Sequence, residues 1–170
     1  MRKRKARRIK ALAEDIVKYG ADIIDSDGHH STAKYIQHGS TSVQDHSISV
    51  ACMCLTLARA LRIRTDYYDL VRGALLHDYF LYDWHIYDPA RGHGHGFKHA
   101  SIAVERAAED FSVTPRMAEM MKKHMWPLNP ALPRIREAYI LIVADKLCSL
   151  RETFGRPHYY MILDDIKGDK

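Results

Sequence analysis

Histidine and aspartate side chains recur along this chain where the surrounding apolar residues have helical spacing. An unpaired polar group on the buried face of a helix is costly, so a single such residue is usually hydrogen-bonded within the core. Several of them on successive segments, all of types that bind metals, predict a shared metal centre instead. The candidate metal ligands are His46, His77, Asp78, His99, His124 and Asp145.

The donor types indicate which metals such a centre would hold. Imidazole suits iron, zinc and nickel, whereas carboxylate suits manganese and magnesium, and no cysteine occupies a matching position for a thiolate-held structural zinc. Six ligands exceed what one tetrahedral ion takes. They would complete one octahedral site or, more naturally, hold two ions with a bridging carboxylate and room for water. We therefore expect two divalent cations, drawn from Fe, Mn, Zn, Ni, Co and Mg.

The pattern of apolar residues predicts that helices position these ligands. Almost no strand-like alternation is present, which favours an all-α, single-domain helical bundle. The expected helices cover residues 4–24, 31–37, 42–60, 66–78, 98–111, 115–124 and 134–154, with a short one at 159–166. Residues 81–97 contain glycines, a proline and extra histidines and are expected to form a long, functional loop.

Length and composition suit one globular domain: the chain has 170 residues, of which 46% are hydrophobic and 28% charged. We expect three parts, namely a basic N-terminal helix packed on the domain (1–30), a metal-binding domain (31–155) and a C-terminal tail (156–170). The net charge of +5 reflects seven basic residues and no acid within residues 2–10. Without interleaved aromatic residues, this stretch predicts a solvated helical turn rather than a nucleic-acid site.

Apolar runs in the sequence bear on whether a membrane is a partner. No apolar run is long enough for a signal peptide or a membrane span, so no membrane partner is expected. The odd count of three cysteines suits a reducing compartment. These features predict a cytoplasmic protein, and they leave its oligomeric state open.

The ordered set His, His-Asp, Asp on a helical chain resembles the HD-domain superfamily of metal-dependent phosphohydrolases. The resemblance covers about residues 38–155 and is carried by the segments HGSTSVQDHS, RGALLHDYFLYDWH, HGFKHA, KHMWPL and ADKLCSL. It implies a first metal held by His46, His77, Asp78 and Asp145. His99 and His124 match the extra pair of the binuclear members, with Asp78 as the bridge.

Binuclear members of this superfamily include cyclic-dinucleotide phosphodiesterases and symmetrical diadenosine tetraphosphate hydrolases. Many relatives continue the His-Asp pair with Ile-Gly, whereas this chain has Tyr79-Phe80, and the GYP signature of one phosphodiesterase class is missing. These departures argue against a cyclic dinucleotide. The expected substrate is a nucleotide or another small phosphate ester.

Residues beside the ligands are candidates for contact with that substrate. Lys146 directly follows Asp145, and we expect it to act with Asp78 in catalysis by neutralising a substrate phosphate. Lys98 precedes His99 and would contact a phosphate, while Trp126 would stack on a base or ring. Arg72 is off the apolar stripe of its helix and is expected to be solvated.

Two other functions remain open at this point. The same four histidines and two aspartates resemble those of the di-iron oxygenases of the superfamily, and ligand identity alone does not separate the two chemistries. A non-catalytic ligand-binding or nucleic-acid-binding module that uses the basic N-terminus is the second alternative. It leaves the six metal-ligand residues unexplained.

Overall fold

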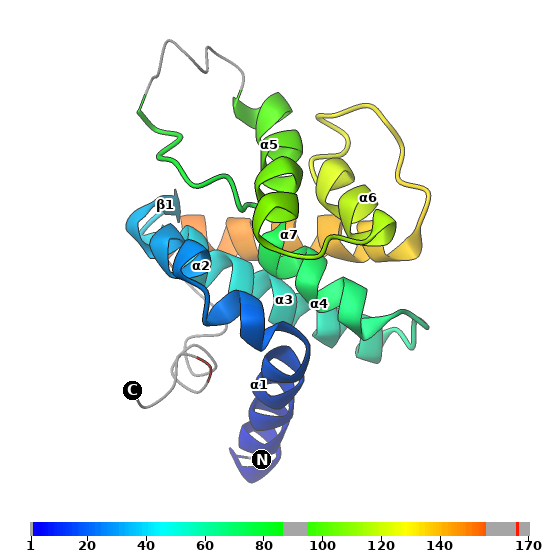
Figure 1. Ribbon diagram of the computed structural model, residues 1–170. Helices are drawn as coiled ribbons and strands as arrows, with labels where there is room; N and C mark the ends of the chain where they lie inside the picture. The colour runs from blue at the N-terminus through cyan, green and yellow to red at the C-terminus, as the bar shows by residue number, and fades with distance from the viewer. Residues whose placement is uncertain (1, 87–94, 156–165, 167–170) are drawn as a thin grey trace.

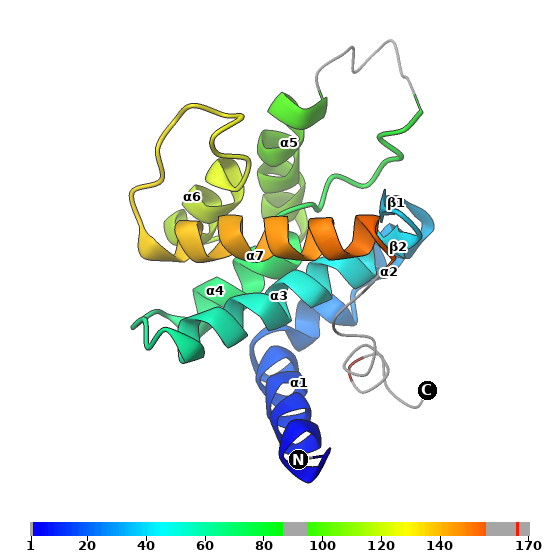
Figure 2. The ribbon, with the colours of Figure 1, turned by 180° about the vertical axis from the view of Figure 1, so that it is seen from behind.

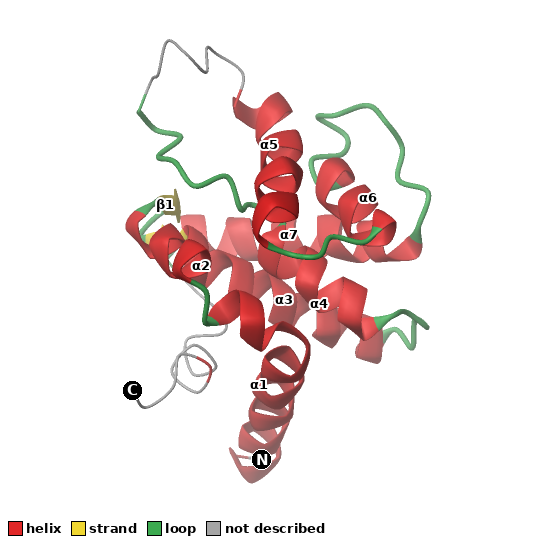
Figure 3. Cartoon of the chain, in the orientation of Figure 1, coloured by secondary structure: helices red, strands yellow, loops and turns green. Residues whose placement is uncertain are grey.

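The computed structural model describes residues 2–86, 95–155 and 166. Within these ranges it is built almost entirely of helices, which confirms the expected all-α class (Figure 3). The elements are α1 (Arg2–Ile24), α2 (Asp27–Ser31), a 3₁₀ turn (Thr32–Lys34), β1 (Ile36–His38), β2 (Thr41–Ser42), α3 (Val43–Ala60), α4 (Tyr67–Leu76), α5 (His95–Asp110), α6 (Pro115–Lys123) and α7 (Arg136–Thr153). None of the described helices is both long and apolar enough to cross a membrane.

Local sequence signals set the starts of the helices that carry the ligands. The hydroxyl of Ser42 accepts the backbone N–H of Asp45 at the start of α3, and the carboxylate of Asp66 accepts two backbone N–H groups at the start of α4. Thr114 caps α6 in the same way, followed by Pro115. Each cap satisfies a backbone donor that a helix leaves unpaired at its N-terminus.

The core lies where α3, α4 and α7 pack against one another (Figure 1). Leu55, Leu70 and Leu141, one from each helix, are fully buried there. In Figure 1, α5 and α6 stand above this layer and α1 extends below it. The five helices that carry the predicted ligands therefore converge on one region of the bundle.

The helix expected over residues 31–37 is wrong. The chain instead passes from α2 through the 3₁₀ turn into a β-hairpin in which Ile36 pairs with Ser42 and His38 with Thr41. Gly39 makes this turn possible, because its φ is +59° and a Cβ there would lie 2.7 Å from the carbonyl oxygen of Glu152. The hairpin is thereby held against the end of α7.

Three further expectations need correction. Helix α4 ends at Leu76 with His77 as its C-cap residue, so Asp78 lies beyond the helix rather than within it. Arg72 is buried, not solvated, because its guanidinium forms an ion pair with Asp22 of α1. Helix α5 begins at His95, inside the expected loop 81–97, of which residues 87–94 lie outside the described part. The helix expected at 159–166 also lies outside it, apart from the buried, helical Ile166.

Candidate metal centre

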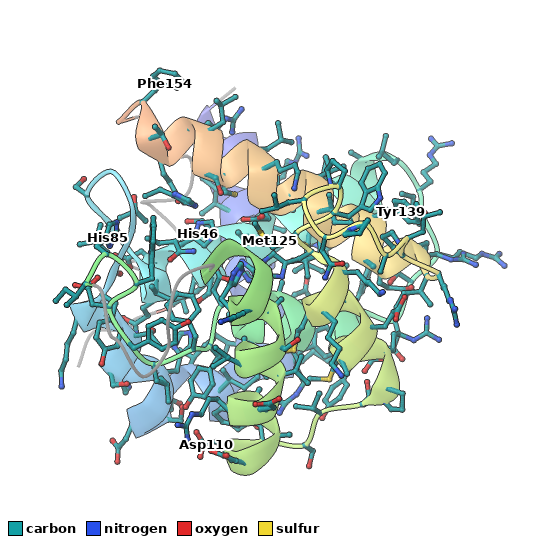
Figure 4. All side chains as sticks on the ribbon, turned by 90° about the horizontal axis from the view of Figure 1, so that it is seen from above. His46, His85, Asp110, Met125, Tyr139 and Phe154 are labelled. Carbon is teal, nitrogen blue, oxygen red and sulfur yellow. The ribbon has the colours of Figure 1, made fainter. Side chains whose placement is uncertain are left out.

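The structure brings all six predicted ligands together, each from a different position on the bundle. His46 lies in the first turns of α3, His99 in the first turns of α5 and Asp145 in the middle of α7. His77 and His124 are the residues that terminate α4 and α6, and Asp78 directly follows the first of them. All six side chains are buried. Figure 4 labels His46, which lies on the inner side of α7.

One group of donor atoms is formed by α3, α4 and α7. The Nε2 atom of His46 lies 3.2 Å from Oδ1 of Asp145, and Nε2 of His77 lies 3.8 Å from the same oxygen. Asp78 contributes its Oδ2 atom, which lies 3.8 Å from Nε2 of His46 and 3.3 Å from Nε2 of His77. These four donors surround one point.

A second group forms on the other side of Asp78. The Nε2 atoms of His99 and His124 lie 2.9 Å apart. Oδ1 of Asp78 lies 3.4 Å from the first and 3.6 Å from the second. The two oxygens of one carboxylate therefore face two different sets of imidazoles.

Hydrogen bonds on the far side of the rings determine which nitrogen faces the centre. Nδ1 of His77 is 2.7 Å from the carbonyl oxygen of Ala74, and Nδ1 of His124 is 2.7 Å from that of Met121. A carbonyl oxygen can only accept, so each Nδ1 carries the hydrogen and each neutral ring presents the Nε2 lone pair inward. The rings are oriented as metal-binding imidazoles usually are.

Unsatisfied polar atoms support a metal at this position. Nε2 of His77 and Oδ1 of Asp78 are buried without a hydrogen-bond partner in the described structure. Ligands of one ion with bonds of about 2.1 Å lie roughly 3 to 3.5 Å apart, which is close to most of the donor separations within each group. Two overlapping sets of three ligands, His46, His77, Asp145 and His77, Asp78, His124, each place one donor atom per residue within 4.8 Å of one another, and the second set spans both groups. The residues present therefore fit a divalent metal.

Buried charges also shift the pKa values of the ligands. Burial lowers the pKa of His46, but hydrogen bonds and charges from Asp145 and Glu152 outweigh it and raise that pKa to about 10. Burial raises the pKa of Asp78, but the neighbouring histidines, above all His77, hold it well below its usual value. For His124, burial is the largest effect and lowers the pKa to about 4. The metal-free centre thus keeps anionic carboxylates beside a protonated His46.

Comparison with protein-family models gives a match to the family described as the HD domain, over residues 43–150. The chain belongs to the HD domain family. This places it in a superfamily of metal-dependent phosphohydrolases, with which the buried His/Asp groups are compatible. Neither curated proteins nor solved structures gave a match to this HD domain.

Two residues outside the matched range contact the ligands of this HD domain, and neither was predicted from the sequence. Oε2 of the buried Glu152 lies 2.7 Å from Nδ1 of His46. The Nε2 amide of Gln37, in β1, donates to Oδ2 of Asp78. Glu152 was detectable, because it follows Asp145 by two helical turns on the same face. Gln37 gave no such signal, because its segment was expected to be a helix.

The roles of Lys98, Lys146 and Trp126 in substrate contact stay predictions. Lys146 is exposed on α7, roughly 100° around the helix from Asp145. Lys98 is exposed on α5, and Trp126 is half-buried in the turn after α6. His38 is half-buried, and its ring centroid lies 5.2 Å from that of His46.

Proposed function

We propose that this HD domain is a phosphohydrolase with a binuclear metal centre that cleaves a phosphate ester of a nucleotide or another small molecule. The position of Asp78 is the observation that supports it. Its Oδ2 faces His46 and His77, and its Oδ1 faces His99 and His124. A carboxylate so placed suits a bridge between two ions rather than a ligand of one.

In this proposal the protein residues hold and orient the reacting groups. Once His46 is deprotonated, the four imidazoles would present Nε2 lone pairs, and Asp78 and Asp145 add two negative charges that favour divalent cations. A bound pair of ions supplies hydroxide at neutral pH and offsets charge on phosphoryl oxygens. Burial of the ligands limits the access of bulk water, which strengthens these electrostatic interactions.

The substrate would approach from the side of the exposed lysines. Lys146 and Lys98 would each offer an ammonium group to a phosphate oxygen, and Trp126 would stack on a base or ring. All three roles are part of the proposal. Replacing Lys98 or Lys146 with alanine should raise KM for a charged ester and change metal content little.

The test combines metal content with phosphate release. Protein stripped of metal and reloaded with Mn²⁺, Co²⁺, Zn²⁺ or Fe²⁺ is assayed against a panel of nucleotides and phosphate esters. Asp78→Asn should reduce metal content and abolish turnover. Asp27→Asn, on an exposed position of α2, should change neither.

Other outcomes would point to different functions. Full metal content and turnover in Asp78→Asn would contradict the bridging role. Oxygen consumption by the iron-loaded protein, without phosphate release, would favour the di-iron oxygenase. Salt-sensitive nucleic-acid binding lost on deletion of residues 2–10, with no turnover, would favour the binding module.

A further inference from the structure

The outer face of α7 carries a stripe of large apolar side chains that the bundle leaves exposed. Figure 2 shows α7 across the front of the molecule, with none of the other described helices or strands over it. The stripe consists of Tyr139 (45% exposed), Val143 (48%), Leu147 (37%), Leu150 (58%) and Phe154 (70%). Contiguous exposed apolar residues of this size commonly mark an interaction site.

This outer stripe lies opposite the face of α7 that serves the metal centre. Asp145 is two residues from both Val143 and Leu147, which places it roughly 200° around the helix from each. In Figure 4, Phe154 and Tyr139 lie towards the two ends of α7, and His46 lies on its inner side. A helix at the surface normally has one apolar face, whereas a helix that is apolar on opposite faces is normally buried on both.

Few charged residues accompany the outer stripe on α7. Apart from the stripe, the exposed residues of this fully described helix are Arg136, Lys146 and Thr153. A face with five large apolar groups and few charges has the composition of an interface core.

We propose that the outer stripe of α7 is the interface of a two-fold dimer in which the α7 helices of two copies pack antiparallel. The stripe has aromatic residues at both ends and aliphatic residues between, so it is close to symmetric about its middle. Antiparallel pairing places Tyr139 against the partner's Phe154 and Val143 against the partner's Leu150. Leu147 then meets the partner's Leu147 near the two-fold axis.

Three physical features favour a second copy as the occupant. A two-fold interface requires a surface that complements itself, and this stripe matches its own reverse in side-chain size. Antiparallel helices place each positive N-terminus beside a negative C-terminus. Steps of four, three and four residues from Val143 to Phe154 are also the spacing with which one helix packs along another.

The size of the interface sets the expected affinity. A helix of 18 residues is about 27 Å long and about 10 Å wide. The area that two such faces would bury is at or below the lower end of specific interfaces, about 1,000 Å². We therefore expect a dimer that dissociates on dilution into the micromolar range.

The oligomeric state tests the proposal directly. Sedimentation velocity of the metal-loaded protein, from about 1 to about 200 μM, should show a species of twice the 19.6 kDa chain mass at the higher concentrations. Leu150→Glu should remain monomeric throughout. Leu61→Glu, at a 65% exposed leucine beyond the end of α3, is the matched control and should dimerise like the wild type. A monomeric wild type at 200 μM, or dimerisation of folded Leu150→Glu, would overturn the proposal.

Cysteine cross-linking tests the antiparallel arrangement separately. Leu147→Cys should form a disulfide-linked dimer on oxidation, whereas Leu61→Cys and the wild type, whose cysteines are buried, should not. Tyr139→Cys mixed with Phe154→Cys should cross-link, while either variant alone should not. Cross-linking of each variant alone would indicate parallel helices and contradict the arrangement.

Discussion

The four histidines differ in what holds the ring on the side away from the centre. His77 and His124 donate to the backbone carbonyls of Ala74 and Met121 in their own helices. Any residue type at positions 74 and 121 would provide these carbonyls. His46 instead depends on the side chain of Glu152, 106 positions later in the chain. A mutation of Glu152 can therefore disturb the orientation of His46, although Glu152 does not itself face the metal-binding donor atoms.

Replacement of Glu152 should weaken metal binding. The carboxylate of Glu152 orients the His46 ring and makes that ring more basic. Glu152→Ala removes this acceptor, and loss of such a partner typically lowers metal affinity about 10- to 100-fold. Glu152→Gln keeps an acceptor without the charge and should fall between Ala and wild type. Chelator competition measures the affinity. Glu109→Ala, at an exposed acid of α5, is the control, and equal affinities for Glu109→Ala and Glu152→Ala would contradict the role.

Metal affinity should also depend on pH. Because the pKa of His46 is raised to about 10 in the metal-free centre, a metal must displace its proton at neutral pH. The apparent affinity for Co²⁺ should therefore increase about tenfold for each unit between pH 6.5 and 8.5, per proton displaced. Competition titrations at several pH values measure the slope. Equal affinity across this range would show that His46 binds no proton in the free protein.

Among the helices and strands, those predicted correctly from the sequence are the ones whose ends are determined by neighbouring residues. Thr114 followed by Pro115 defines the start of α6 without reference to the rest of the chain, and the structure confirms it. The hairpin was missed because its strands are very short and depend on Gly39 packing against the end of α7. Arg72 was misjudged for a similar reason: the polar face of α4 is covered by α1, and Asp22 supplies the counter-charge.

The same contrast explains what was predictable at the metal centre. The six ligands stood out because they interrupt apolar stripes, and the structure brings them together. Glu152 shares a face of α7 with Asp145 and was detectable from that spacing, whereas Gln37 depends on how the hairpin packs around the centre. No local pattern encodes that packing.

The cap of α6 allows a prediction about this element. The Thr114 hydroxyl accepts the N–H of Met117 and donates to Oδ1 of Asp69, linking the start of α6 to α4. Thr114→Ala should lower the free energy of unfolding by about 1 kcal/mol. Thr114→Ser keeps the hydroxyl and should lose much less, as measured by urea unfolding. Equal losses in both variants would assign the effect to the methyl group. Metal content should stay unchanged, because His124 lies at the other end of α6.

For the whole molecule, the buried ionisable groups predict that metal-free protein is most stable near pH 6.5. The pKa of His46 is raised to about 10, and that of His77 is also raised, so the folded state holds protons that the unfolded chain releases above about 6.5. Their stabilisation is complete below pH 6.5 and is lost as the pH rises towards 10. Above pH 9.0 the buried Cys52 and Cys54 act in the same direction, because their pKa values are also raised.

The acid side of the stability curve follows from groups shifted the other way. The pKa of His124 is lowered to about 4, so between pH 6.5 and 4 the unfolded chain binds a proton that the folded protein does not bind. The free energy of unfolding therefore falls as the pH falls through this range. Asp78 and Asp145, whose pKa values are also lowered, add to the loss below their usual value of 3.8. Thermal unfolding of chelator-treated protein from pH 4 to 10 should therefore show a maximum near 6.5. A bound metal requires deprotonated histidines, so its stabilising effect should be greatest on the alkaline side. A melting temperature of the metal-free protein that rises steadily from pH 7 to 9 would show that the charges of the centre do not control its stability.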